Sequence, residues 1–421
     1  MKYLFALLLF VVPVQLFAQV ASDTLDLNDL VLEALRNNPE LKAFEYNRDA
    51  MEARVPQAGS LDDPELQYMR EEMLGFKWGE AMYSRIELMQ MFRFPGKLST
   101  QSEIAEIGAE HAHHEHMEKA NEVLMKLRSA YFELWFAQQS IALNRENARL
   151  LQQFVKTTLT RYGVGEAPQQ DALKSYVEMA KVDNQLVTLR QQELSAKAML
   201  VALLNRPSND TLGVAVVSND IVFTPTLDTV QYLALRYRPM LWHDSLSVEE
   251  SEKMLSLAKK EYLPDFKLGL QYVTVPTSDF KGWSVSARIT LPFAPWTLGK
   301  ANARVEEATI SIGKSKETLN NSRNMVLSSV RDLYFKAQST KKQLENYTTV
   351  IVPQSQQALR ASMMAYQTGK TDFLMLIDSY RTLVELSMEK LMLRMQFEQT
   401  IAEMKRAVGY SGIFETRNER N

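Results

Sequence analysis

The feature that most restricts the fold of this chain is an internal duplication with a spacing of about 200 residues. The segment "ALRNNPEL" at 34–41 returns as "ALRYRPML" at 234–241, with five identical residues in register. Further pairs follow in the same order along the chain: "DPELQY" and "LPDFKL", "AYFELW" and "LYFKAQ", and "RYGVG" and "AYQTG". Repetition in a fixed order predicts two copies of one structural unit, each about 190 residues long.

The duplication sets the predicted domain organisation. We expect a first repeat over 19–210, a linker over 211–226, a second repeat over 227–410 and a polar C-terminal tail over 411–421. Residues 1–18 combine one lysine, an apolar run and a small residue at Ala18, which is typical of a cleaved signal peptide. A retained membrane anchor is the alternative, but the run is short for a membrane span.

Each repeat is predicted to be mainly helical. We expect helices over about 28–59, 97–162 and 169–206 in the first repeat, and over 227–262, 300–366 and 371–409 in the second. The first long stretch contains no proline, so it predicts one helix on the order of 100 Å long. The two shorter helices of a repeat together match its long helix in length, which predicts that they lie end to end beside it. Pro353 should kink the second long helix.

Two pairs of strands are predicted, over about 64–73 and 83–94 in the first repeat and over 265–273 and 283–293 in the second. In "WSVSARITLPF", the last of these, every second residue is apolar, which is the period of a strand with one apolar face. Strands of about ten residues with aromatic residues near their ends are typical of outer-membrane barrels. A half-buried hairpin packed on a helix is the alternative for one pair alone.

In the barrel interpretation Val285, Ile289 and Leu291 face lipid, and the residues between them line an aqueous interior. Four strands cannot close a barrel, because about eight are needed before side chains can fill the interior. The barrel must therefore be shared between chains. The predicted fold is mainly α with a small β part: four strands per chain contribute to a trimeric 12-stranded transmembrane β-barrel, and long coiled-coil-like helices form an α-barrel.

Composition excludes several classes of function. A formal charge of −3 leaves no basic excess for binding nucleic acid. The chain has no cysteine and no GxSxG, phosphate-loop or HExxH motif, so we expect neither an enzyme nor a bound cofactor. After residue 21 no stretch approaches the roughly 18 apolar residues of a membrane helix, so a membrane crossing would require a closed barrel.

The segment "EHAHHEH" contains four of the five histidines: His111, His113, His114 and His116. Their spacings of three and four residues suit a pair of metal ligands on one helix face. The alternative is a solvated helix face without a metal ion, and it is favoured. His243 stands alone in the sequence, and we interpret it as structural.

The ordered set "LRNNPEL", "FPGK", "AYFELWF" and "RYGVG…D", with its second copy "LRYRPML", "LGK", "LYFKA" and "AYQTGKTDFLMLIDSY", resembles the TolC-type outer-membrane efflux proteins. The resemblance extends from about Leu25 to Gly409. It implies a homotrimeric channel in the bacterial outer membrane, with its helical part in the periplasm. It also implies a passive exit duct that docks to a periplasmic adaptor protein and an inner-membrane pump.

The same resemblance implies the site residues. Tyr366 matches the tyrosine of a periplasmic gate, and Asp378 matches an acidic position of the constriction. Met375 replaces a second acidic residue of the family pattern, and Asp372 is a nearby candidate substitute. For either aspartate, a solvated helix face or a helix cap is the alternative. Gly165 and Gly369 mark two hairpin tips that would contact the adaptor.

Two questions stay open at the level of sequence. The helices alone would also suit a periplasmic coiled-coil tether without a pore, although such a protein would not need two amphipathic hairpins at equivalent places. The exported substrate could be a metal ion, a drug or an organic solute, because in such a system the pump determines which substrate enters the channel.

Overall fold

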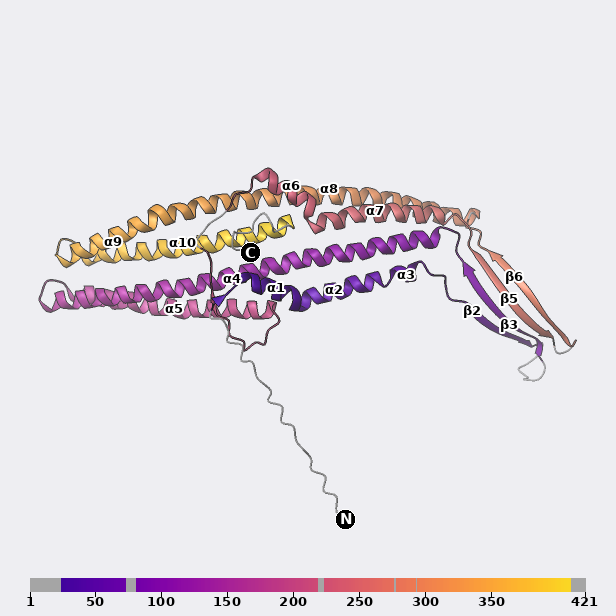
Figure 1. Cartoon of the computed structure of the whole chain (residues 1–421), viewed down its shortest axis with the longest axis horizontal. Helices are drawn as coiled ribbons and strands as arrows, with labels where there is room; N and C mark the ends of the chain where they lie inside the picture. The colour runs from indigo at the N-terminus through magenta and orange to yellow at the C-terminus, as the bar shows by residue number, and fades with distance from the viewer. Residues whose placement is uncertain (1–23, 73–80, 219–222, 276–277, 293, 410–421) are drawn as a thin grey trace, which may run out of the picture.

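Figure 1 shows an elongated molecule in which the helices run along one axis and a small sheet lies at one end. The computed structural model describes residues 24–72, 81–218, 223–275, 278–292 and 294–409. The predicted signal peptide and the predicted C-terminal tail lie outside the described residues.

The two repeats have the same order of helices and strands. The first contains α1 (Leu27–Asn37), α2 (Pro39–Glu52), α3 (Val55–Ala58), β2 (Glu65–Glu72), β3 (Ala81–Phe92), α4 (Lys97–Gly163) and α5 (Gln169–Leu203). The second contains α6 (Leu227–Tyr237), α7 (Pro239–Lys260), β5 (Phe266–Val275), β6 (Phe280–Ile289), α8 (Pro295–Asn346), the π-helical turn η1 (Tyr347–Ile351), α9 (Val352–Gln367) and α10 (Phe373–Val408). This order confirms the predicted duplicated, mainly helical fold.

Helix α4 is continuous over 67 residues, and shorter helices cover it along its length. In Figure 1, α5 lies along one half of α4, and α1, α2 and α3 lie along the other half, end to end. Buried side chains on α4 recur at spacings of three and four residues, as at Leu127, Tyr131 and Leu134. The predicted end-to-end arrangement is therefore confirmed, and the spacing of these side chains gives α4 a coiled-coil-like apolar seam.

Prolines break two helices that were predicted to be continuous. The predicted helix over 28–59 stops before Pro39, where the side-chain oxygen of Asn38 caps a new helix by accepting two backbone N–H groups at 2.9 and 3.1 Å. An asparagine cap followed by proline is a strong signal for a helix start. The predicted helix over 227–262 is also broken before a proline, Pro239, but Arg238 makes no side-chain cap there.

The second long helix changes its winding just before Pro353. Here the N–H of Val352 bonds to the carbonyl of Tyr347, five residues back, so the turn η1 is wider than an α-helical turn. Proline has no N–H to donate to the preceding turn, and a π turn is one way in which a helix accommodates that loss. A kink was predicted at Pro353, and what the structure shows next to this residue is the π turn.

A short parallel pair of strands, β1 (Thr24–Leu25) and β4 (Val214–Ala215), ties the segment between the repeats to the first repeat. The buried hydroxyl of Tyr131 lies beneath it, 2.9 Å from the carbonyl oxygen of Leu25 and 2.8 Å from that of Val216. Burial raises the pKa of Tyr131 to about 12, so the hydroxyl keeps its proton. Nothing in the local sequence pattern predicted this contact.

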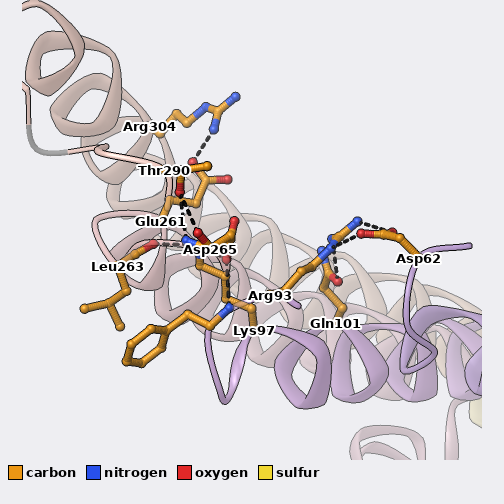
Figure 2. A network of polar contacts seen from close by, with 10 residues as sticks. Asp62, Arg93, Lys97, Gln101, Glu261, Leu263, Asp265, Thr290 and Arg304 are labelled. Carbon is orange, nitrogen blue, oxygen red and sulfur yellow. Dashed lines mark hydrogen bonds and ion pairs between the residues drawn. The ribbon is translucent and has the colours of Figure 1, made fainter. Parts of the chain in front are cut away.

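A polar network joins the sheet to the helices (Figure 2). The Nζ atom of Lys97, at the start of α4, donates to Oδ1 of Asp265 at 2.9 Å and to the carbonyl of Leu263 at 2.8 Å. Beside it, Arg93 forms two hydrogen bonds to the carboxylate of Asp62, at 2.9 and 3.2 Å. The side chains of Lys97 and Asp265 are only 8% and 19% exposed, so this ion pair is largely shielded from water.

We expect Lys97→Met to lower the free energy of unfolding by about 2–3 kcal/mol, because it leaves the carboxylate of Asp265 partly buried without its cation. Circular dichroism during denaturant unfolding measures the change. The control is Lys336→Met, which removes an exposed lysine paired with Asp332 and should have no measurable effect. Equal losses in the two variants would contradict a special role for the Lys97 pair.

Candidate functional site

The four-stranded sheet has one large apolar face that no described residue covers. The strand order is β2-β3-β5-β6, and all three pairings are antiparallel. Residues that are paired directly across strands share a face, so the register joins one apolar surface across the whole sheet. It includes Leu66, Tyr68, Ile86, Leu88, Leu268, Leu270, Trp283, Val285 and Ile289, each at least 45% exposed. A continuous apolar surface of this extent marks contact with lipid or with a partner.

The opposite face of the sheet is polar. Its central group is Glu87, which is 1% exposed although it carries a carboxylate. Oε1 of Glu87 accepts a hydrogen bond from Ser286 at 3.2 Å and one from Arg288 at 3.3 Å, two strands away. A Cβ atom at Gly269 would lie 2.9 Å from this oxygen, so glycine at that position makes room for the carboxylate. Ser286 and Arg288 thus lie on the polar face of the sheet and Val285 and Ile289 on the apolar face, as the alternation along β6 predicted.

Leu291 does not belong to the strand. β6 ends at Ile289, four residues before the predicted end at residue 293, and Leu291 lies in the following turn with 56% exposure. The N–H of Thr290 bonds to the carbonyl of Asp265 and completes the last contact with the neighbouring strand. The strand also begins three residues earlier than predicted, at Phe280.

The outer strands of the sheet are β2 and β6, and within the described residues each pairs on one side only. Their free N–H and C=O groups are able to pair with another strand. The sheet thus has an apolar face, a polar face and an unpaired strand edge on each side within the described residues.

The helical hairpins end at two tips, at the opposite end of the molecule from the sheet (Figure 1). Both tips reverse through a glycine with positive φ, 79° at Gly165 and 71° at Gly369. At both, the residue after glycine bonds back to the carbonyl five residues earlier, at 2.8 Å. This is the Schellman arrangement, which needs a left-handed residue and therefore favours glycine.

Three side chains fasten one hairpin to the other near these tips. The guanidinium of Arg161, near the end of α4, lies 4.7 Å from the ring centroid of Tyr366 and donates to the carbonyl of the same residue. The hydroxyl of Tyr366 donates to Oδ2 of Asp171, on α5, at 3.1 Å. Burial and the charge of Asp171 raise the pKa of Tyr366 to about 12, so its hydroxyl remains a donor. We call Arg161, Asp171 and Tyr366 the tip cluster.

A hollow of about 480 Å³ opens beside the tip cluster, and Lys174 and Asp372 contribute to its lining. Asp372 also caps α10, since its Oδ1 accepts the N–H of Met375 at 3.0 Å. Asp378 lies one to two turns into α10 and is exposed. The structure therefore brings Tyr366 together with Arg161 and Asp171. Asp372 lines the same hollow as Tyr366, and its hydrogen bond goes to the N–H of Met375.

Sequence reasoning did not assign roles to Arg161 and Asp171. Both belong to the motif "RYGVG…D" of the first repeat, so the signal was present. A comparable link lies farther from the tip, where Arg381 of α10 donates to the buried carboxylate of Glu178 of α5. Two charged links thus hold α5 to the second hairpin.

The histidine segment does not lie on one surface, although the ring centroids of His113 and His114 are 5.5 Å apart. His113 is exposed, and His116 faces the charged groups of α2. His111 lies against α7, with its ring centroid 4.3 Å from that of His243, and His114 stacks on Trp242 of the same helix. His243 stands alone in the sequence, but the fold places its ring beside that of His111. Among the described residues, no group of three or more histidine, aspartate or glutamate side chains could hold a metal ion.

In the part of the chain that the structure describes, no helix combines the length and the apolar character of a membrane-spanning segment.

Comparisons with known proteins agree with this architecture. The family model described as "Outer membrane efflux protein" matches residues 30–206 and 230–410. The chain is 21% identical over 404 residues to the cobalt-zinc-cadmium resistance protein CzcC of Cupriavidus metallidurans, across 94% of this chain and 93% of that protein. The solved structure of CusC matches with a TM-score of 0.80 at 16% identity, over 91% of this chain and 92% of the other. VceC from Vibrio cholerae matches with a TM-score of 0.76 at 17% identity, over 91% and 96%.

Proposed function

Because the chain belongs to the outer membrane efflux protein family, we propose that three copies of it form the passive exit duct of a tripartite efflux system. As a family member it is a channel protein of the outer membrane, not an enzyme. The observation that carries the proposal is the sheet, with its exposed apolar face, its polar face and its two open edges.

A threefold assembly would provide a hydrogen-bond partner for the unpaired backbone groups at both edges of the sheet. The free edge of β6 in one chain would pair with the free edge of β2 in the next, and three sheets of four strands would close into a barrel of twelve. The exposed apolar face then meets lipid, while Glu87 and its neighbours line the lumen. Val285 and Ile289 are lipid-facing in this arrangement, and Leu291 lies at the periplasmic rim.

The helices support the same assembly. Large apolar side chains are exposed on α5 and α8, although both helices pack against other helices of the chain. They include Leu173, Val177, Val187 and Leu194 on α5, and Ile310 and Met325 on α8. Such surfaces would be covered by the helices of neighbouring chains in a closed α-barrel.

The tips form the gate and the docking site in this proposal. The tip cluster holds the two hairpins of one chain together, and its release would let the α9–α10 hairpin move away. The exposed carboxylates of Asp372 and Asp378, repeated three times around a narrow bore, would attract cations. The turns at Gly165 and Gly369 would meet a periplasmic adaptor, which links the duct to an inner-membrane pump.

Metal ions are the first cargo to test, because the relative CzcC is named for resistance to cobalt, zinc and cadmium. A strain that lacks the gene should become sensitive to those three ions while its sensitivity to organic drugs stays unchanged. If the strain became sensitive to organic drugs alone, the exported substrate would be a drug and not a metal ion.

The decisive experiment combines fractionation with conductance measurement. We expect the protein in the outer-membrane fraction, soluble only in detergent, with the mass of a trimer. In planar bilayers the purified trimer should conduct ions, because its barrel and helical lumen form one water-filled path. A monomer or dimer in the soluble periplasmic fraction would instead support a coiled-coil tether without a pore.

A further inference from the structure

A cavity of about 290 Å³ lies where the two helical hairpins of the chain meet, and no residue of the tip cluster lines it. Its lining includes Asn144 and Asn147 of α4, Glu178 of α5 and Tyr380 of α10. Pockets for small molecules have volumes from about 300 Å³ upward, and a few polar groups in a mostly apolar wall orient the ligand. The cavity has the size of the smallest such pockets.

The buried seam of α4 changes from apolar to polar at this cavity. Asn144 and Asn147 are 6% and 7% exposed, and they belong to the same three- and four-residue spacing as Leu151 and Phe154 farther along the helix. Neither side-chain amide has a hydrogen-bond partner among the described residues. A buried amide without a partner destabilises a fold, so packing alone does not explain asparagine at both positions.

Tyr380 adds a buried hydroxyl to the same wall. The residue is 3% exposed, and its ring packs edge-on against Phe154 with the centroids 5.7 Å apart. Its Oη atom has no hydrogen-bond partner among the described residues. Burial, together with the charge of Glu178, raises the pKa of Tyr380, so the hydroxyl keeps its proton and is a donor. Buried polar groups are almost always hydrogen-bonded, and three such groups around one cavity indicate a place for a hydrogen-bonding ligand.

The charges around the cavity balance. The lining contains two carboxylates, Glu178 and Glu385, and two cations, Lys181 and Arg381. The carboxylate of Glu178 is hydrogen-bonded by both cations. The cavity therefore has no net charge that would favour an anion or a cation. The apolar part of its wall consists of Val182, Val384 and Met388.

We propose that this cavity binds one small uncharged molecule per chain, with an apolar body the size of an aromatic ring and one amide group. The hydroxyl of Tyr380 would donate to the amide oxygen of the ligand, and the side-chain oxygens of Asn144 and Asn147 would accept its N–H groups. The apolar body would pack against Val182 and Val384. An amide fits because the free groups of the wall include both donors and acceptors.

A bound molecule would touch α4 and α5 of the first hairpin and α10 of the second. Tyr380 belongs to the same buried apolar cluster as Tyr366 of the tip cluster, so the ligand would hold α10 in the packing that the tip cluster also requires. Binding uses residues of a single chain, so the inference does not depend on the proposed cargo or on the existence of a pore. A protein that fails to conduct ions would still bind the ligand, and the two proposals can fail separately.

The test is a titration of para-fluorobenzamide with the purified full-length protein in detergent, followed by fluorine NMR. The signal of the probe should broaden and shift in a saturable way, at one molecule per chain. Tyr380→Phe should weaken binding by about 10-fold, because it deletes one hydrogen bond and keeps the ring. Val384→Trp should abolish binding, because the larger side chain fills the cavity.

Two controls separate the cavity from the detergent and from other surfaces. Tyr176→Phe removes the hydroxyl of an exposed tyrosine on α5 and should leave binding unchanged. The second probe, para-fluorotoluene, has the ring without the amide. It enters detergent micelles, and its signal should be the same with the wild type and with Val384→Trp.

The proposal is overturned if the wild type shows no saturable binding, or if Tyr380→Phe or Val384→Trp binds para-fluorobenzamide as tightly as the wild type. Weaker binding in Tyr176→Phe would also overturn it, since the probe would then bind elsewhere. Helical circular dichroism and the mass of the protein in detergent establish that each variant is folded. Should Val384→Trp fail to fold, Tyr380→Phe decides the test, because it keeps the packing of the ring.

Discussion

Arginine in place of Val285 is expected to prevent the protein from accumulating as a trimer in the outer membrane. Val285 is 78% exposed at the middle of β6, on the apolar face of the sheet. An arginine near the bilayer midplane of a barrel costs about 2–4 kcal/mol, so three chains together would lose about 6–12 kcal/mol. That loss is comparable with the whole stability of a typical folded domain, about 5–15 kcal/mol.

The matched control is Ser284→Arg, one residue away on the polar face. In the proposed barrel this arginine would point into water, so the amount of trimer should stay near the wild-type level. Quantitative immunoblots of membrane fractions, together with native gels, measure both variants. Equal depletion of the trimer in the two variants, or no depletion in either, would contradict the assignment of lipid and water to the two faces.

The double variant Arg161→Ala, Asp171→Ala should hold the periplasmic end open. It removes the cation above the ring of Tyr366 and the acceptor of its hydroxyl. Hydrogen bonds to charged groups contribute about 1.5–3 kcal/mol each, so we expect the closed state to lose about 2 kcal/mol of stability per chain. Three chains that open together would then lose about 6 kcal/mol, and about 5.5 kcal/mol is enough to turn a 1:99 equilibrium into 99:1.

Single-channel conductance in planar bilayers measures this effect. We expect the open-state conductance to predominate in the double variant and to be rare in the wild type. Arg145→Ala serves as the control, because Arg145 is an exposed arginine on the same helix, α4, outside the tip cluster. A double variant that remains trimeric and keeps the conductance of the wild type would remove the tip cluster from gating.

Local patterns in the sequence were sufficient to predict which residues share a face within a single strand or helix. The period of two in β6 placed Val285 and Ser286 on opposite faces, because the strand geometry leaves no other choice. The buried face of α4 is likewise a local pattern, since Leu127 and Tyr131 are four residues apart and lie on the same side of the helix. Even the breaks before Pro39 and Pro239 had local signals, since proline disfavours a helical residue before it.

Contacts between distant elements were not accessible in this way. The ring contact between His111 and His243 joins residues 132 positions apart, and it does not follow the spacing of the duplication. Tyr366 was identified by resemblance, but its partners Arg161 and Asp171 depend on how the two hairpins pack. Periodicity specifies which face of a helix is buried, not which charged residue of another helix meets it.

The π turn η1 makes the two long helices mechanically unequal. α4 is one uninterrupted α-helix of 67 residues, whereas the corresponding helix of the second repeat contains the π turn at Tyr347–Ile351. Helices bend most readily where such a turn interrupts the regular ladder of hydrogen bonds. A force applied at the tips should therefore bend the second hairpin at its π turn and leave the first hairpin straight. Each chain thus combines one rigid hairpin with one that can bend.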